Sequence, residues 1–493
     1  MKIVIVGGGT AGWISAFMLS KLQPNHSYTV IDSSKIGIIG VGESTTGHFR
    51  DIIVDPFFGT SEEEFMKETD ATLKLGIYFK DWKCLGEDFY NPIDGSVTAK
   101  EFLDYLTYYA LYSGNPIDTS SIDGFLNRKK LSTFYKDSDL KSNNLHAYHF
   151  DTHKTSEFLK KKCIEYGVTH IDNKVIDCEL NESGFITSVI HEDNSKTEGD
   201  FFIDASGFSR ILISKVNNEW ISFKDNLPVN SVVPFVLDQT ENFEPVTKCL
   251  ALSSGWLWQI PTSKKIGSGY VYCDEYLTQD QAIDEVEQYL GTKINPVKFI
   301  KFESGRFKKV WSKNCLAIGL AGSFLEPLQS TNIHTTIIQI KNFHKKYLRQ
   351  TFELTYSESN TEKFSGEIGM MVDNFKDFVN LHYTGNRTDS DFWKMISTKN
   401  HLTDFTKNII EISNHRGLFS DDFLYYHGCT GIQLWIYSVM GLGYITDNTL
   451  NNIFLDQNLL NHCKILYEDF QNYMNLESEK FYTNKDLMEI IHK

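Results

Sequence analysis

The first thirty residues change hydrophobic pattern twice. Residues 2–6 (KIVIV) form a short, continuous apolar run of the kind found in a buried parallel strand. Residues 11–22 place apolar side chains at helical spacing, and residues 28–32 (YTVID) return to strand character. The pattern predicts a strand–helix–strand unit, from which α/β folds with parallel sheets are built.

A second strand-rich block covers residues 168–205. Its apolar runs VTHI, VIDCEL, ITSVIHED and FFIDA are separated by polar turns such as residues 181–184. Short strands joined by such turns predict a β-meander inserted after the first unit.

The pattern becomes helical beyond about residue 341. Apolar side chains between Phe364 and Val379 recur at steps of three and four, with Thr361 placed to cap the helix and Gly385 to end it. We therefore expect a mixed α/β chain of two parts. Its α/β body, with an inserted β-sheet, covers residues 1–340, and a mainly helical lobe covers residues 341–493.

Composition narrows the class of protein. The 48 Lys and Arg against 64 Asp and Glu give a net charge of −16, which argues against nucleic acid or an anionic membrane surface as partner. No apolar stretch reaches the roughly 18 residues of a membrane span, and the eight cysteines form no C-x-x-C pair. We expect a soluble, cytoplasmic protein. Its 8 Trp, 24 Tyr and 35 Phe can also wall a pocket for a flat ligand.

A glycine motif follows the first strand. Residues 7–12 (GGGTAG) contain G-x-G-x-x-G, in which Gly7 permits a tight turn, Gly9 lets the backbone approach a pyrophosphate, and Gly12 lets helix and strand pack closely. Asp32 ends the second strand, where a carboxylate accepts hydrogen bonds from a ribose. Strand, glycines, helix, strand and acid in this order predict a dinucleotide site.

Two later segments favour FAD over NAD as the dinucleotide. Residues 204–210 (DASGFSR) and 317–322 (AIGLAG) each end an apolar run in small residues, which would allow close approach to a long, extended ligand. A single contiguous Rossmann domain, typical of NAD enzymes, fits the interleaved blocks less well. The sequence thus predicts an FAD-binding Rossmann body of the glutathione-reductase type.

A tryptophan motif identifies the family that the sequence resembles. Residues 256–261 (WLWQIP) match W-x-W-x-I-P, which together with the glycine motif is the signature of flavin-dependent halogenases of the tryptophan halogenase type. About four-fifths of the chain resembles this family, and the likeness fades after about residue 395. Further similar segments are GIIGVGES (37–44), AYHFDTHKTSEFLK (147–160), GYVY (269–272), AIGLAGSFLEPLQSTNI (317–333) and LHYTGNRTDSDFW (381–393).

The resemblance implies a reaction and its partners. In this family reduced FAD from a separate flavin reductase, O2 and a halide (chloride, bromide or iodide) yield hypohalous acid. The acid crosses an internal tunnel to a small aromatic substrate of the indole or phenol type. A homodimer is one assembly compatible with such a chain, and neither nucleic acid nor a membrane is expected as a partner.

The resemblance also assigns residues to the flavin and to the tunnel. Trp256 and Trp258 alternate on a predicted strand, so both rings face one side, where they form a barrier between flavin and substrate. The expected flavin contacts are Gly7, Gly9, Thr10, Ala11, Gly12, Asp32, Gly42, Glu43, Ser44, Val175, Ser206, Gly207, Leu320 and Ile333.

The catalytic residues that the resemblance implies include one departure. Lys74 takes the place of the family's catalytic lysine, and the backbone N–H groups of Thr331 and Asn332 would hold the halide. Asn332 replaces the family's glycine. Asparagine tolerates a positive φ better than most residues, so we expect the arrangement of N–H groups to survive this replacement. Gln329 replaces the family's glutamate, and an amide can hydrogen-bond but cannot act as a base near neutral pH. Glu326 is a conceivable substitute.

Other functions remain as alternatives. His149, Asp151 and His153 suggest an iron site, but the leading strand–helix–strand unit does not fit the barrel of iron oxygenases, so no metal is expected. An FAD-dependent aromatic monooxygenase would insert oxygen without halide. A catalytically altered FAD-binding protein would keep the cofactor site and lose the reaction.

Overall fold

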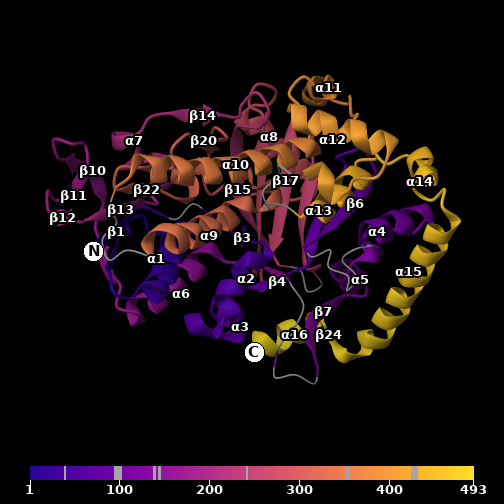
Figure 1. Cartoon of the computed structure of the whole chain (residues 1–493), viewed down its shortest axis with the longest axis horizontal. Helices are drawn as coiled ribbons and strands as arrows, with labels where there is room; N and C mark the ends of the chain where they lie inside the picture. Colours follow the sequence, from indigo (N-terminus) through magenta and orange to yellow (C-terminus); the bar gives the residue numbers. More distant parts are fainter. Residues whose placement is uncertain are drawn as a thin grey trace.

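The predicted strand–helix–strand unit is confirmed in the computed structural model, where it lies in a six-stranded sheet (Figure 1). Strand β1 (Lys2–Val6) pairs in parallel with β2 (Ser27–Asp32) on one side and β13 (Phe201–Asp204) on the other. Helix α1 (Thr10–Leu22) packs against α6 (Thr152–Glu165). The other strands are β9 (Thr169–Asp172), β22 (Cys315–Ala317) and β21 (Trp311–Ser312).

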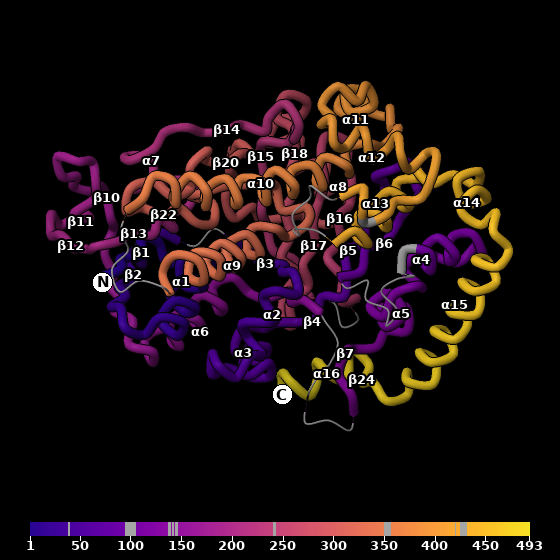
Figure 2. Tube along the Cα trace, in the orientation of Figure 1, coloured from indigo at the N-terminus to yellow at the C-terminus, as the bar shows by residue number. Residues whose placement is uncertain are grey.

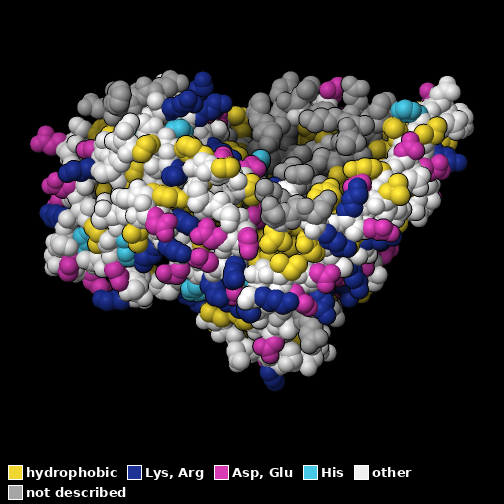
Figure 3. All heavy atoms as spheres, turned by 90° about the horizontal axis from the view of Figure 1, so that it is seen from below, with side chains coloured by type: hydrophobic (Ala, Val, Ile, Leu, Met, Phe, Trp, Pro, Cys, Tyr) yellow, Lys and Arg dark blue, Asp and Glu magenta, His cyan; other side chains and the backbone are white. Residues whose placement is uncertain are grey.

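The structure describes most of the chain. The described residues are 1–37, 40–93, 103–136, 140, 142, 146–239, 243–349, 356–423 and 431–493, so residues 38 and 39 of the GIIGVGES segment lie outside them. Within these ranges, none of the helices has the length and apolar character needed to cross a membrane. Lys and Arg side chains are interspersed with Asp and Glu on the face seen in Figure 3.

The strand-rich block forms a smaller meander than predicted. All four predicted apolar runs are strands, but the first and last, β9 and β13, join the parallel sheet on either side of the first unit. Only the residues between them form a separate antiparallel sheet, because their turns are short enough for neighbours to pair. That sheet consists of β10 (Val175–Leu180), β11 (Ile186–His191) and β12 (Lys196–Glu198).

A seven-stranded sheet carries the tryptophan motif. Strand β17 (Gly255–Pro261) lies between β18 (Lys265–Tyr272) and β16 (Val246–Ala251) in antiparallel pairing. The seven-stranded sheet also contains β19 (Ile300–Lys301), β15 (Ser231–Asp238), β5 (Gly76–Lys80) and β6 (Asp88–Pro92).

Three small sheets contain the remaining strands of the described ranges. The small sheets pair β3 (Glu43–Ser44), β8 (Ala147–Phe150) and β4 (Thr72–Lys74); β14 (Trp220–Ser222), β20 (Gly305–Phe307) and β23 (Ser323–Phe324); and β24 (Phe481–Thr483) with β7 (Leu131–Tyr135).

The long helix predicted around residues 364–379 is α10 (Glu358–His382), but its ends differ from the prediction. Ser357, not Thr361, is the cap, since its hydroxyl accepts from the Asn360 N–H while the Thr361 hydroxyl bonds to the Glu358 carbonyl within the first turn. Gly385 does not end the helix. A Cβ there would lie 2.1 Å from the Trp82 carbonyl oxygen, so this glycine allows close packing instead.

Helices that are far apart in sequence pack against one another. Helix α9 (Thr331–Phe343) spans the expected boundary at residue 340, packs on α1, and runs beside α10 (Figure 1). Figure 2 shows α15 (Gln457–Glu477) lying beside α4 (Leu103–Tyr112), far from it in sequence. The other helices are α2 (Gly47–Val54), α3 (Glu62–Glu68), α5 (Ile122–Arg128), α7 (Ile213–Val216), α8 (Gln279–Leu290), α11 (Asp391–Ser397), α12 (Asp404–His415), α13 (Ile432–Gly441), α14 (Asp447–Ile453) and α16 (Asn484–Ile491).

Candidate active site

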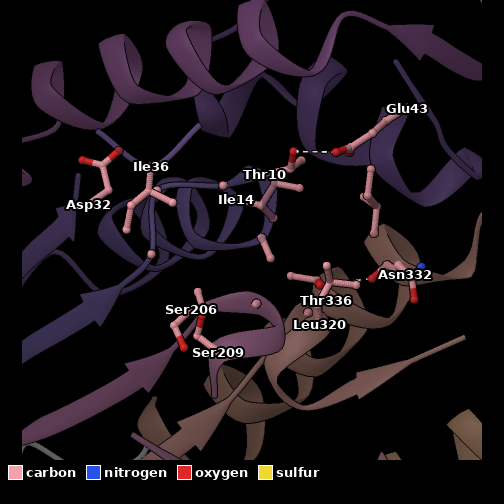
Figure 4. Close-up of a pocket in the computed structure, with 18 of the residues that line it drawn as sticks. Thr10, Ile14, Asp32, Ile36, Glu43, Ser206, Ser209, Leu320, Asn332 and Thr336 are labelled. Atoms are coloured by element: carbon pink, nitrogen blue, oxygen red, sulfur yellow. Dashed lines mark hydrogen bonds between the residues drawn. The ribbon is translucent and has the colours of Figure 1, made fainter. Parts of the chain in front are cut away.

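A cavity of about 410 Å³ lies at the carboxyl end of β1. Asp32 lies toward one side of it in Figure 4 and Asn332 and Glu43 toward the other, with Thr10 between them. Of the predicted flavin contacts, all except Gly12 line this cavity. The structure therefore brings together residues from β1, β2, β3, the strand-rich block and α9 in one site.

The three glycines of the motif occupy different environments. Gly7 has φ +118°, and a Cβ there would lie 2.2 Å from the Ala205 carbonyl oxygen. A Cβ on Gly12 would lie 1.9 Å from the Gly7 carbonyl oxygen, so Gly12 serves the packing of helix on strand. Gly9 precedes the first turn of α1 and a Cβ there would meet no protein atom within 4 Å, so its backbone faces open space in the cavity.

Two carboxylates lie on the cavity wall. Asp32 is hydrogen-bonded through Oδ1 to Nε2 of His170. Glu43 accepts a hydrogen bond of 3.0 Å from the Thr10 hydroxyl, and burial raises the pKa of its carboxyl to about 7. Both carboxyl groups can accept hydrogen bonds from a polar ligand that passes along α1.

The two tryptophans of the motif lie on the same side of β17, as predicted, and both line the cavity. Their ring centroids are 6.2 Å apart. Trp256 is buried and its indole N–H donates to Oε2 of Glu326 at 3.0 Å, an oxygen that also accepts from the Tyr383 hydroxyl at 2.7 Å. Burial raises the pKa of the Glu326 carboxyl to about 7. Glu326 therefore holds the Trp256 ring in place.

Lys74 on β4 is completely buried and lies outside the cavity lining. Its Nζ donates to the carbonyl of Thr45 and to the hydroxyl of Ser330, each at 3.0 Å. Burial lowers the pKa of its ammonium to about 7, because desolvation disfavours the charged form. Ser330 does line the cavity, so this hydroxyl connects Lys74 to the cavity wall.

The start of α9 offers backbone N–H groups to an anion. Ser330 precedes the helix with φ +57°, no side chain caps the helix, and no acidic residue lies in its first turn. The left-handed residue is therefore Ser330, and Asn332 lies inside the helix, so position 332 does not call on the tolerance of asparagine for a positive φ. The first N–H groups of a helix have no intrahelical acceptor and attract anions. Asn332 lines the cavity, whereas Thr331 does not.

Gln329 also lies outside the cavity lining, on the side of α10. Its side-chain nitrogen lies 2.9 Å from Nε2 of His382, the last residue of α10. Sequence reasoning did not find His382, because the two residues are 53 positions apart and no motif links them. It also gave no role to Ser330, because the family resemblance assigns roles only to the neighbouring residues Gln329, Thr331 and Asn332.

The residues that suggested iron have other partners. His149 is buried and bonds to the Thr247 hydroxyl at 2.8 Å, while Asp151 caps α6 by accepting from the Lys154 N–H. Thr247 in turn bonds to Ser44, and both hydroxyls line the cavity. Among the described residues no group of three His, Cys, Asp or Glu side chains is placed to hold a metal ion.

Comparison with known proteins gives a consistent result. The sequence model of the tryptophan halogenase family matches residues 2–452. The chain is 31% identical to the tryptophan 6-halogenase ThaL of Streptomyces albogriseolus over 83% of this chain and 81% of that protein. It is 32% identical to the tryptophan 7-halogenase RebH of Lentzea aerocolonigenes over 80% and 78%.

A solved structure agrees over almost the whole chain. The crystal structure of the tryptophan 6-halogenase SttH from Streptomyces toxytricini superimposes with a TM-score of 0.88 and 26% identity, covering 99% of each chain. The fold is thus that of a known group of enzymes. The chain belongs to the tryptophan halogenase family of flavin-dependent halogenases.

Proposed function

We propose that this chain uses reduced FAD, supplied by a separate flavin reductase, with O2 and a halide to halogenate a small electron-rich aromatic molecule. The observation that carries the proposal is Lys74, a fully buried lysine whose hydrogen bond to Ser330 joins it to the cavity wall. Burying an amine without a carboxylate partner costs free energy. Ionisable groups that are buried in this way cluster at functional sites, which favours a catalytic role for Lys74.

The cavity residues fit FAD. The missing Cβ of Gly9 leaves room for a pyrophosphate over the N-terminus of α1, whose N–H groups favour an anion. Asp32 would accept hydrogen bonds from a ribose, and Gly42, Glu43, Ser44, Ser206 and Leu320 would hold the remainder. When bound, reduced FAD would supply two of the four electrons that reduce O2, and the oxidation of halide to hypohalous acid would supply the other two.

The N-terminus of α9 is the proposed halide site. The N–H groups of Thr331 and Asn332 would bind chloride, bromide or iodide, and the absence of an acidic side chain from the first turn keeps the local potential favourable. Trp256 and Trp258 would separate the halide and the flavin from the aromatic substrate. Confinement by such rings keeps a reactive acid away from water.

Lys74 would activate hypohalous acid. Its two described hydrogen bonds both go to oxygen acceptors, which leaves the ammonium one further N–H to donate. A hydrogen bond from this N–H to the oxygen of hypohalous acid makes the halogen more electrophilic. The ring carbon of the substrate then takes the halogen, and the oxygen leaves as water after accepting a proton.

The neutral Gln329 restricts the substrate. After halogen adds to the ring, the ring proton must leave, and an amide cannot take it near neutral pH. In a phenol or an indole, the lone pair of the oxygen or nitrogen stabilises the cationic intermediate, so that it forms readily and the water released in the same step can take the ring proton without a dedicated base. Gln329 therefore favours such activated rings as substrates.

The larger-scale organisation follows the same proposal. Residues 1–340 would form the FAD-binding body and residues 341–493 a helical lobe over the substrate side. The flavin reductase would bind only transiently, and a homodimer is compatible with the chain.

Product analysis with matched variants tests the proposed function. Purified protein is given reduced FAD, O2, each halide and a panel of indoles and phenols, and halogenated products are measured by mass spectrometry. The variant Lys74→Met keeps the length of the side chain and should lower product formation by at least about a hundredfold. The control variant Lys80→Met, on the neighbouring strand β5, should retain it.

Two results would contradict the proposal. Equal activity of the wild type and Lys74→Met would remove the lysine from the mechanism. A hydroxylated product formed without halide would indicate direct oxygen insertion, an alternative that the family relationship does not favour.

A further inference from the structure

The hydrogen bonds of His382 fix where its proton lies. Nδ1 of the ring lies 2.9 Å from the backbone carbonyl of Phe378, and a carbonyl oxygen can only accept. Nδ1 must therefore carry a hydrogen and donate it. Burial lowers the pKa of the imidazole to about 4, so the ring is neutral near pH 7 and holds no second proton.

This protonation state in turn fixes the amide of Gln329. With its proton on Nδ1, the ring presents Nε2 as an acceptor. The Gln329 atom at 2.9 Å from Nε2 must be a donor, so it is the NH2 group. The carbonyl oxygen of the same amide consequently points away from His382, and a rotated amide would place two acceptors against each other.

The imidazole is held firmly enough to impose this orientation. His382 is completely buried, and its ring centroid lies 4.8 Å from Phe79, 5.3 Å from Phe378 and 6.1 Å from Trp82. Rings in contact on several sides leave no room for the imidazole to turn over. Ser330, the hydroxyl that accepts from Lys74, directly follows Gln329 in the chain.

We infer that His382 is a positioning residue that orients Gln329, so that the amide oxygen, one residue before the Ser330 hydroxyl that accepts from Lys74, serves as a fixed, neutral hydrogen-bond acceptor in the halogenation step. This inference rests on the proposed function. A glutamate at position 329 would have no hydrogen to donate to Nε2 unless a proton were added to the pair. The glutamine thus matches the neutral histidine, which gives the departure from the family a physical reason.

A cycle of variants tests the inference by kinetics. His382→Leu removes the acceptor and should lower kcat about tenfold, with the KM for the aromatic substrate changed less than twofold. His382→Gln supplies an oxygen near the position of Nε2 and should restore at least half of kcat. The double variant His382→Leu with Gln329→Leu should be no slower than the slower single variant, because coupled residues are not additive. His401→Leu, a buried histidine bonded to the Tyr383 carbonyl, is the matched control and should leave kcat within about twofold.

Thermal unfolding gives a readout that needs no turnover. His382→Leu and Gln329→Leu should each lower Tm by about 2 °C, and the double variant should lower it by less than the sum. Additive changes in Tm, multiplied losses in kcat, or failure of His382→Gln to restore kcat would overturn the pairing. Absence of halogenated product from the wild type, with coupled Tm values, would instead overturn the proposed function.

Discussion

Lys74 and the residues around it show how burial sets chemistry at the scale of single side chains. Within the described ranges the lysine has no salt bridge, and its two hydrogen-bond partners, Thr45 and Ser330, are uncharged. Desolvation is therefore opposed by few favourable charges, and the pKa of the ammonium falls to about 7. The enzyme would hold comparable amounts of ammonium and amine at neutral pH.

This pKa predicts the pH dependence of halogenation. If the ammonium activates hypohalous acid, the rate should fall as pH rises through about 7, and it should be about tenfold lower at pH 8 than at pH 6. The measurement is kcat for product formation across this range. Lys74→Arg stays charged throughout, so its residual rate should lack this fall. A wild-type rate that rises through pH 7 would show that the amine is the active form.

At the scale of elements, the first turn of α1 separates two tasks that the glycine motif combines. Gly12 lies against the Gly7 carbonyl, whereas Gly9 faces open space. Gly9→Ala should therefore leave the Tm of the FAD-free protein within about 1 °C and weaken FAD binding at least tenfold. Gly12→Ala should lower Tm or abolish soluble protein. Isothermal titration and thermal unfolding check both, and equal FAD affinity of Gly9→Ala and wild type would contradict the proposed pyrophosphate position.

Helix α9 offers a second prediction at this scale. Asn332→Asp places a carboxylate in its first turn without changing the side-chain shape, and the added negative charge should raise the KM for halide about tenfold. Asn342→Asp, at the other end of the same helix, is the control and should leave this KM unchanged. Unchanged halide dependence in both variants would place the halide elsewhere.

Local patterns allowed the elements near the glycine motif to be predicted, because turn, helix and strand there depend on neighbours in sequence. The predicted flavin contacts came from the same motif and from the family resemblance. The smaller meander, the φ of Ser330 and the partner of Gln329 depend on segments that meet only in the folded chain. The prediction of Thr361 as the cap was wrong because Ser357, four residues earlier, carries the same kind of hydroxyl, and the sequence pattern does not show which of the two begins the helix.

At the scale of the whole molecule, the end of the chain supports the strand that carries Lys74. Nε2 of His492 bonds to the carbonyl of Ala71, one residue before β4, and Phe481, Leu487 and Ile491 are buried nearby in β24 and α16. These contacts connect the last residues of the chain to the start of β4 through the backbone. They make the C-terminal segment part of the core.

Removal of residues 478–493 should therefore destabilise the whole protein. Loss of four buried apolar side chains, those of Phe481, Leu487, Met488 and Ile491, should lower Tm by at least about 5 °C, measured by thermal unfolding. Removal of the exposed Lys493 alone is the control and should leave Tm unchanged. A truncated protein with wild-type Tm and kcat would show that β4 needs no such support.

The pair of indoles in the cavity wall also gives the protein an optical property. Trp256 and Trp258 line the cavity and lie 6.2 Å from each other. A flavin bound there would be close enough to take up the energy of their excited states, so their emission should weaken as the cavity fills. Occupancy could then be followed from the intrinsic fluorescence of unlabelled protein, even before any product forms.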